Sequence, residues 1–305
     1  MLALQIKNIS KKFNGFYAVK NFSLSVPEGT IYGILGPNGA GKTTTIRMIM
    51  NILVPDEGEI LIFNKRMDDA LKNRIGYLPE ERGLYRKMKV FEVLSYFGEL
   101  KGMSRKEISK KIDEWLSRIE LIEWKNRKIE ELSKGMQQKI QFISTILHSP
   151  DLIIFDEPFA GLDPINTNLL KDIMLELKKQ GKTILYSTHL MEHAEKLSDY
   201  VALINKGEKV LDGKLSEIKA KFGKNLVLEF EGDNGFLKEI KGIKRIYNFG
   251  RYVELELKKE TNPQDVLKEV VNKVKLIKFE VAEPSLNDIF IRVVGEEKNE
   301  IRKNH

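Results

Sequence analysis

Hydrophobic residues along the first two thirds of the chain follow two patterns. Residues 2–6 (LALQI) and 22–26 (FSLSV) alternate apolar and polar positions, which predicts half-buried strands. Three runs are almost wholly apolar and predict buried strands: IYGIL at 31–35, LIIF at 152–155 and TILYS at 183–187. Strands that alternate with helical segments indicate an α/β core on a mostly parallel sheet.

A helical pattern interrupts this core between residues 86 and 149. Ser104 and Glu107 have the spacing of a capping box, which predicts the start of a helix. Apolar residues recur behind this box at helical spacing: Ile108, Ile112, Leu116 and Ile119. We therefore predict a helical insert at about 86–149 within a larger domain that spans residues 1–220.

The last part of the chain, residues 221–305, has a pattern of its own. It is predicted to run strand (LVLEF), helix, strand (KRIYNF), strand (YVELEL), helix and strand (LIKFEV). This βαββαβ order predicts a small ferredoxin-like α+β domain. Residues 215–224 are expected to form a helix and a connector before it.

Composition limits the classes of function. The chain has no cysteine, which excludes disulfides, Cys-ligated zinc and thiol catalysis and suits a reducing cytosol. The net charge of +7 fits nucleic acid or an anionic surface, but also a Lys-rich exterior with interspersed Glu. We favour the Lys-rich exterior as the explanation of this charge and expect no nucleic-acid partner. No run approaches the roughly 20 apolar residues of a membrane span, and the N-terminus has no signal-peptide pattern, so we expect a soluble chain.

A glycine-rich segment between a buried strand and a helix matches the phosphate-loop pattern G-x-x-x-x-G-K-[ST]. Its glycines let backbone N–H groups point at phosphate oxygens, and the helix start adds positive charge. Lys42 can neutralise the β- and γ-phosphates, and the Thr43 hydroxyl can bind Mg²⁺. The expected ATP-binding residues are Gly36, Pro37, Asn38, Gly39, Ala40, Gly41, Lys42, Thr43 and Thr44.

Two adjacent acids follow the apolar strand LIIF. Asp156 and Glu157 therefore lie at the carboxyl end of a strand, where open α/β sheets carry their ligands. Asp156 is suited to hold hydrated Mg²⁺, and Glu157 to orient and deprotonate the attacking water. The alternative is that this acidic pair only forms a turn.

The order of these motifs resembles that of the ABC ATPase superfamily over about the first 215 residues. LSKGMQQK at 132–139 resembles the family's signature motif, GLDP at 161–164 its aspartate loop, and STH at 187–189 its switch histidine. The resemblance implies a P-loop NTPase core of the RecA-like type. It also implies a head-to-tail dimer, in which ATP on one subunit is completed by Ser133 and Gly135 of the other.

The resemblance also assigns roles to residues outside the phosphate loop. Asp163 would couple the two sites of the dimer, and His189 would contact the γ-phosphate and sense its loss. Phe13 matches the aromatic residue that stacks on adenine, with Tyr17 as a competing candidate and a core phenylalanine as the other reading.

Glu80, in GYLPEERGLY, stands where the family usually has glutamine. We expect its carboxylate to face Mg²⁺ and the attacking water, as both a metal ligand and a catalytic group. The alternative is a solvent-exposed charge beside Glu81 and Arg82. The signature-like motif also departs from its family, with Lys134 for glycine and Met136 for glutamine.

The segment around Glu80 and the C-terminal EPSLNDIF resemble the ATP-binding subunits of prokaryotic sodium- and drug-efflux exporters. This implies a peripheral subunit on the cytoplasmic face of the membrane, paired with a separate permease. Residues 91–101 and the preceding loop are a candidate docking groove, or equally ordinary core. The alternatives are a soluble ABC ATPase that acts on nucleic acid or the ribosome, and a regulatory module that retains the fold.

Overall fold

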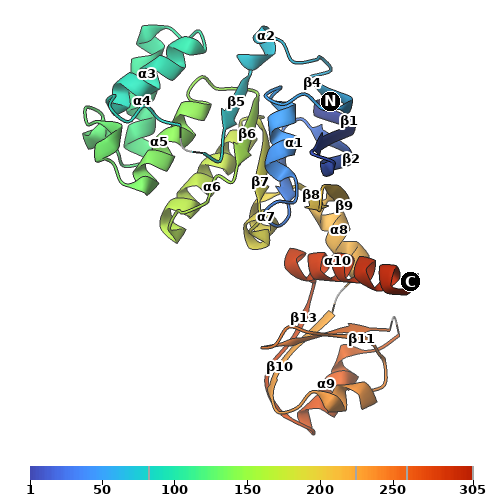
Figure 1. Cartoon of the computed structure of the whole chain (residues 1–305). Coiled ribbons are helices and arrows are strands. Elements are labelled where there is room, and N and C mark those ends of the chain that lie inside the picture. Colours follow the sequence, from blue (N-terminus) through green and yellow to red (C-terminus); the bar gives the residue numbers. More distant parts are fainter. Residues whose placement is uncertain (82, 224, 259, 304–305) are drawn as a thin grey trace. The chain divides into compact units, whose positions relative to one another are not determined.

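The computed structural model describes residues 1–303 except 82, 224 and 259, with side chains through residue 294. It divides into two compact units, Met1–Leu215 and Ser216–His305, and each is described here by itself (Figure 1).

The first unit is built on a six-stranded sheet in the described part of the chain, in the order β5-β6-β7-β3-β8-β9. All neighbours are parallel except the edge strand β9, which is antiparallel to β8. A three-stranded antiparallel sheet, β2-β1-β4, lies in the same unit. The strands are β1 (Leu2–Phe13), β2 (Phe16–Pro27), β3 (Ile31–Leu35), β4 (Glu57–Ile62), β5 (Ile75–Leu78), β6 (Leu152–Asp156), β7 (Thr183–Thr188), β8 (Tyr200–Asn205) and β9 (Glu208–Lys214).

Alternate residues of the buried strands enter two separate hydrophobic clusters. In β6, Ile153 and Phe155 join the cluster that contains the helical insert. Leu152 and Ile154 join the cluster that contains α1 and the antiparallel sheet. Because both faces of the strand are buried, its sequence is apolar throughout, as expected for a parallel sheet.

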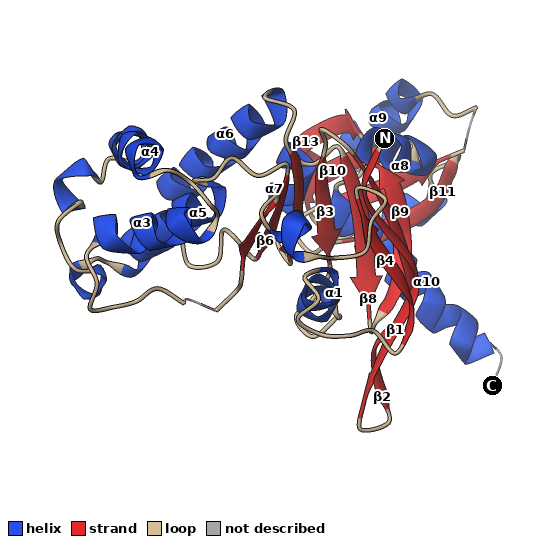
Figure 2. Ribbon diagram, turned by 90° about the horizontal axis from the view of Figure 1, so that it is seen from above, coloured by secondary structure: helices blue, strands red, loops and turns tan. Residues whose placement is uncertain are grey.

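Helices α3, α4 and α5 gather beside the β5–β6 edge of the sheet, away from α1 (Figure 2). Ser104 caps α4 by accepting a hydrogen bond from the Glu107 amide, so the predicted capping box is confirmed. Two short 3₁₀ helices, η1 and η2, connect α4 to α5. The helices of this unit are α1 (Lys42–Ile49), α2 (Asp69–Lys72), α3 (Val90–Leu100), α4 (Arg105–Arg118), η1 (Ile122–Trp124), η2 (Ile129–Glu131), α5 (Lys134–Ile146), α6 (Pro164–Lys179) and α7 (Met191–Leu197).

The second unit contains a four-stranded antiparallel sheet in the order β11-β12-β10-β13, counted over the described residues. This is the order that a split-βαβ chain produces, in agreement with the predicted ferredoxin-like fold. The first predicted helix is only the 3₁₀ helix η3, and α10 was not predicted. The elements of the second unit are α8 (Leu215–Phe222, which begins at the unit boundary), β10 (Asn225–Glu231), η3 (Gly235–Glu239), β11 (Ile243–Asn248), β12 (Val253–Leu257), α9 (Pro263–Val271), β13 (Lys275–Ala282) and α10 (Leu286–Lys303).

Candidate nucleotide-binding and catalytic site

The glycine-rich loop connects β3 to α1 and lies tightly against neighbouring backbone. A Cβ atom on Gly41, whose φ is +108°, would lie 2.4 Å from the carbonyl oxygen of Ala18. A Cβ atom on Gly36 would lie 2.3 Å from the carbonyl oxygen of Ile204. Since only glycine fits at these two positions, the sequence fixes the loop in a closely wrapped path between β2 and β8.

Lys42, the first residue of α1, turns back into this loop. Its Nζ donates hydrogen bonds to the carbonyl oxygens of Gly36 at 2.8 Å and Pro37 at 3.2 Å. The side chain is only 6% exposed. The lysine therefore places a buried positive charge in the loop, where it can meet phosphate oxygens. A hydrogen bond of 3.2 Å from the Ala40 amide to the Pro37 carbonyl oxygen also closes the loop. Asn38 and Gly39 are exposed, and Thr44 is half-buried in α1.

Asp156 ends β6 directly opposite Ser187 of β7. The Ser187 hydroxyl donates to Asp156 Oδ1 at 2.5 Å and accepts from the Glu157 amide at 3.0 Å. One serine therefore holds both acids at the end of the strand. The sequence placed Ser187 in the STH motif but did not predict this role.

Glu157 lies between two groups that could assist proton transfer. Its Oε1 lies 3.4 Å from Lys42 Nζ, and both carboxylate oxygens lie 3.1 Å from His189 Nδ1. The side chain is 8% exposed, and the backbone has a φ of +49°. A glutamate in the left-handed backbone region costs about 1–3 kcal/mol and is usual where function requires one orientation of the side chain. The structure thus brings together three of the predicted catalytic residues.

The predicted metal-binding oxygens also converge. Thr43 Oγ1 lies 3.3 Å from Asp156 Oδ1 and 3.4 Å from Glu80 Oε2. Asp156 Oδ2 is buried without a hydrogen-bond partner among the described residues. Burial raises the pKa of Asp156, and the charges of Glu80 and Glu157 raise it further. Hard oxygen donors, one of them buried and unsatisfied, fit Mg²⁺.

The position of Glu80 separates it from its neighbour. Glu80 follows β5 and turns towards Thr43, whereas Glu81 is 86% exposed and lies 3.4 Å from Arg47. The geometry favours the metal-facing interpretation of Glu80.

Three aromatic side chains are exposed where β1 turns into β2: Phe13, Phe16 and Tyr17. The Nζ of Lys11 lies 5.8 Å from the Phe13 ring, and that of Lys12 lies 4.9 Å from the Tyr17 ring. The adjoining Ala18 backbone passes beside the phosphate loop, as its contact distance to Gly41 shows. Because Phe13 is 44% exposed, the reading as a core phenylalanine is wrong. The choice between Phe13 and Tyr17 as adenine contact stays open.

The remaining predicted residues lie at helix starts. Ser133 caps α5 by accepting from the Met136 amide at 3.3 Å, and Asp163 caps α6 by accepting from the Asn166 amide at 2.9 Å. Gly135 lies in the first turn of α5. No hydrogen bond connects these three residues to the phosphate loop within the described chain.

Gln138 connects the signature-like helix to the catalytic strand. Its Nε2 donates to the carbonyl oxygen of Pro158 at 2.7 Å, immediately after Glu157. Sequence reasoning assigned it no role, although its position in LSKGMQQK was a signal. A movement of α5 would therefore act directly on the segment that holds the candidate base.

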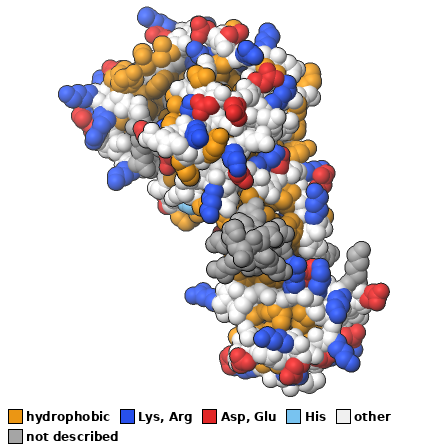
Figure 3. All heavy atoms as spheres, turned by 45° about the vertical axis from the view of Figure 1, so that its right-hand side comes forward, with side chains coloured by type: hydrophobic (Ala, Val, Ile, Leu, Met, Phe, Trp, Pro, Cys, Tyr) orange, Lys and Arg blue, Asp and Glu red, His pale blue; other side chains and the backbone are white. Residues whose placement is uncertain are grey.

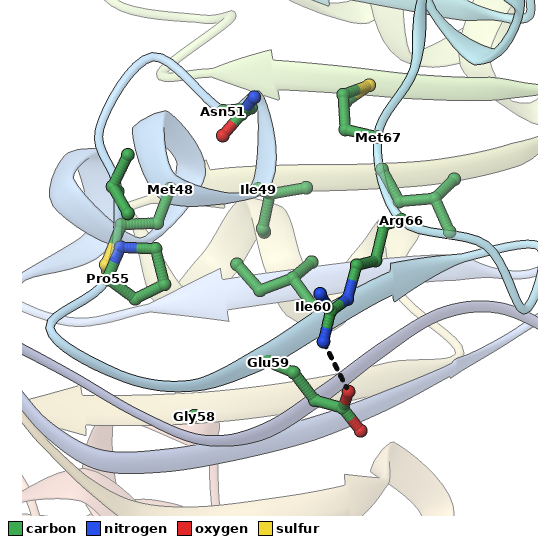
Figure 4. Close-up of a pocket in the computed structure, with 11 residues that line it drawn as sticks. Met48, Ile49, Asn51, Pro55, Gly58, Glu59, Ile60, Arg66 and Met67 are labelled. Atoms are coloured by element: carbon green, nitrogen blue, oxygen red, sulfur yellow. Dashed lines mark ion pairs between the residues drawn. The ribbon is translucent and has the colours of Figure 1, made fainter.

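A cavity of about 380 Å³ lies between α1 and β4, outside this site. Glu59 and Arg66 approach to 3.8 Å beside Ile60 at its edge (Figure 4). None of the candidate site residues lines it, so it has no direct part in nucleotide chemistry.

Comparison with known families covers both units. Residues 19–160 match the family model "ABC transporter", and residues 213–294 match "ATP-binding protein DrrA1-3-like, C-terminal domain". The chain is 46% identical to the ABC transporter ATP-binding protein YhaQ of Bacillus subtilis, over 96% of this chain and 98% of that protein. It is 32% identical to the linearmycin resistance ATP-binding protein LnrL of Bacillus subtilis, over 96% and 98%.

Solved structures agree with these matches. An ATP-binding subunit of an ABC transporter superposes with a TM-score of 0.68 at 31% identity, over 73% of this chain and 94% of that one. CbiO1 of Clostridium perfringens, described as part of the transporter complex cbiONQ, gives a TM-score of 0.64 at 27% identity, over 72% and 91%. Fold and site thus define an ATPase of the ABC class. The chain belongs to the family of ABC transporter ATP-binding subunits, which bind and hydrolyse ATP.

Proposed function

We propose that this chain is the motor of an ABC exporter, in which two copies bind MgATP head to tail and drive a separate membrane permease. The observation that carries the proposal is the buried Glu157 carboxylate, held between Lys42 and His189. Relatives named for linearmycin resistance and Nod factor export support the direction of transport. No helix in the described part of the chain could cross a membrane, so the translocation path would belong to the partner.

In the proposed mechanism each group has one task. The loop amides and Lys42 bind the β- and γ-phosphates, and Phe13 or Tyr17 stacks on adenine. Bound Mg²⁺ would neutralise phosphate oxygens, held through Thr43 and Asp156 with Glu80 beside them. Glu157 accepts the proton of the attacking water, and His189 contacts the γ-phosphate.

The second copy would complete the site. Ser133 presents a hydroxyl at the start of α5, whose exposed amides favour a phosphate. Gly135 would allow close approach, and Asp163 would connect the two sites. ATP would thus join the two copies, and hydrolysis would release them.

The permease is proposed to dock on a cavity of about 460 Å³ between β5, α3 and α5. Leu84, Phe97 and Leu100 give it apolar walls, and the described charged residues that line it, Lys72 and Lys101, are basic. Leu100 is 59% exposed and Tyr96 nearby is 38% exposed, although Val93 and Leu94 on the same helix are core. We infer that the partner offers an apolar segment with an acidic end.

The substitution Glu157→Gln tests the mechanism. Loss of a general base typically costs about 10²–10⁴ in rate, while the phosphate contacts of the loop remain. We expect ATP to convert this variant from monomer to stable dimer, measured by size-exclusion chromatography at micromolar protein.

Glu81→Gln is the matched control, because it removes an exposed carboxylate from the neighbouring loop. It should keep parental turnover and show no ATP-trapped dimer. A Glu157→Gln protein that stays monomeric with ATP, or retains parental turnover, would contradict the head-to-tail mechanism.

A further inference from the structure

A basic cavity of about 480 Å³ lies between the aspartate loop, α6 and α7, behind the candidate catalytic histidine. Lys171 of α6 and Lys196 of α7 line it, together with His189 and His193. Glu192 is the acidic residue among the described residues of its wall. The wall of this open cavity therefore carries more positive than negative side chains.

The two lysines are not neutralised by ion pairs. Within the described chain neither Lys171 nor Lys196 lies within salt-bridge distance of a carboxylate, and Lys171 Nζ instead lies 5.7 Å from the Phe159 ring. Burial lowers the pKa of Lys171, the charge of Lys196 lowers it further, and the charge of Glu192 acts against both. Two like charges in one cavity repel each other, and an anion between them would relieve that repulsion.

His189 connects this cavity to the chemistry of the site. Its ring lines the cavity, while its Nδ1 lies 3.1 Å from both carboxylate oxygens of Glu157. The buried Nδ1 of His193 has no hydrogen-bond partner among the described residues. A group that leaves the position of the γ-phosphate past His189 would therefore meet a polar, positively charged space.

We propose that this cavity is a second anion site, which receives inorganic phosphate after ATP has been cleaved. Lys171 and Lys196 bind the phosphate oxygens, and His193 offers a further polar contact. The cavity is larger than a phosphate ion, so water fills the rest and bridges some of these contacts. This assignment rests on the proposed function, in which Glu157 acts as the base in ATP hydrolysis, and it adds a route by which the phosphate product leaves.

The test measures binding of inorganic phosphate to the full-length chain loaded with MgADP, which occupies the phosphate loop. Isothermal titration calorimetry at low ionic strength compares the parent with Lys171→Gln and Lys196→Gln. Loss of one charge-assisted contact should weaken phosphate binding by about three- to tenfold. Lys179→Gln is the matched control, because Lys179 lies exposed on the same helix outside the cavity and should bind phosphate as the parent does.

A second readout is product inhibition during turnover. Phosphate should inhibit ATP hydrolysis by the parent and the Lys179 variant more strongly than by the two cavity variants. Equal phosphate affinity in all four proteins, or no binding to the ADP-loaded parent at millimolar phosphate, would overturn the proposal. It would also be overturned if the cavity variants lost ATP-dependent dimerisation with unchanged phosphate affinity, since the cavity would then belong to the subunit interface. The Glu157→Gln dimerisation assay reports on the proposed function independently of these results.

Discussion

At the scale of single residues, the buried carboxylate of Asp156 favours magnesium binding but lowers the stability of the fold when no cation is bound. Burial and two neighbouring carboxylates raise its pKa, so its charged form is disfavoured in the folded chain. A raised carboxyl pKa means that ionisation above that pKa destabilises the fold. The hydrogen bonds from Ser187 and Thr43 oppose this effect, and a cation would reverse it.

Glu80 provides the sharpest test of the metal site. Its Oε2 lies 3.4 Å from Thr43 Oγ1, and a carboxylate binds Mg²⁺ more strongly than an amide oxygen. We expect Glu80→Gln to raise the Mg²⁺ concentration for half-maximal ATPase activity by roughly tenfold. The measurement is a magnesium titration of steady-state turnover.

Glu81→Gln controls for the loss of one negative charge in the same loop. Its carboxylate faces Arg47 and solvent, so its magnesium titration should match that of the parent. Superimposable titrations for the parent and both variants would remove Glu80 from the metal site.

The site residues that sequence could predict are those fixed by strands and loops next to them in the chain. Thr43 and Asp156 each follow a recognisable strand or glycine pattern, so their convergence was predictable from parallel-sheet topology. The bridging role of Ser187 was not, because it depends on the register between β6 and β7. The direction of the Glu80 side chain also depended on tertiary packing.

At the scale of elements, the phosphate loop shows why a motif needs its surroundings. Gly39 and Gly41 both have positive φ, +77° and +108°. A Cβ atom on Gly39 would meet nothing within 4 Å, whereas one on Gly41 would lie 2.4 Å from the Ala18 carbonyl oxygen. A side chain at position 39 would therefore meet backbone strain alone, whereas one at position 41 would meet both backbone strain and steric overlap.

We therefore expect Gly39→Ala to cost about 1–2 kcal/mol of stability from backbone strain alone. Gly41→Ala should cost more and weaken ATP binding, since β2 or the loop must move. Thermal unfolding without nucleotide, followed by titration with a fluorescent ATP analogue, measures both effects. Equal melting temperatures for the two variants would show that the loop relaxes freely at Gly41.

Elements with strong periodicity were predicted well, and weakly patterned elements were not. The buried strands and the helix after Ser104 follow directly from apolar spacing. The helix expected after LVLEF is the five-residue η3, because a segment that short does not show a helical period.

At the scale of the whole molecule, side chains of opposite charge lie close together at many surface positions. Basic and acidic side chains are interspersed over the face shown in Figure 3. Several basic residues are paired at the surface, for example Lys7 with Glu59 and Lys20 with Glu208, both at 2.7 Å. Such exposed pairs contribute little stability and are neutral, so the net charge of +7 comes from the excess of Lys and Arg over Asp and Glu.

The two compact units lead to the last prediction. Every candidate nucleotide residue of this chain lies before the boundary at Leu215, and the second unit has its own core of residues such as Leu226, Leu255 and Val266. We expect a fragment that ends near residue 220 to fold and bind ATP with an affinity within about threefold of the parent. Circular dichroism would measure its cooperative melting, and a fluorescent ATP analogue its binding. The same fragment with Lys42→Ala is the control, which should fold but lose nucleotide affinity. If the fragment without the Lys42→Ala substitution is insoluble, or folds without binding nucleotide, the division of the chain near residue 220 is wrong.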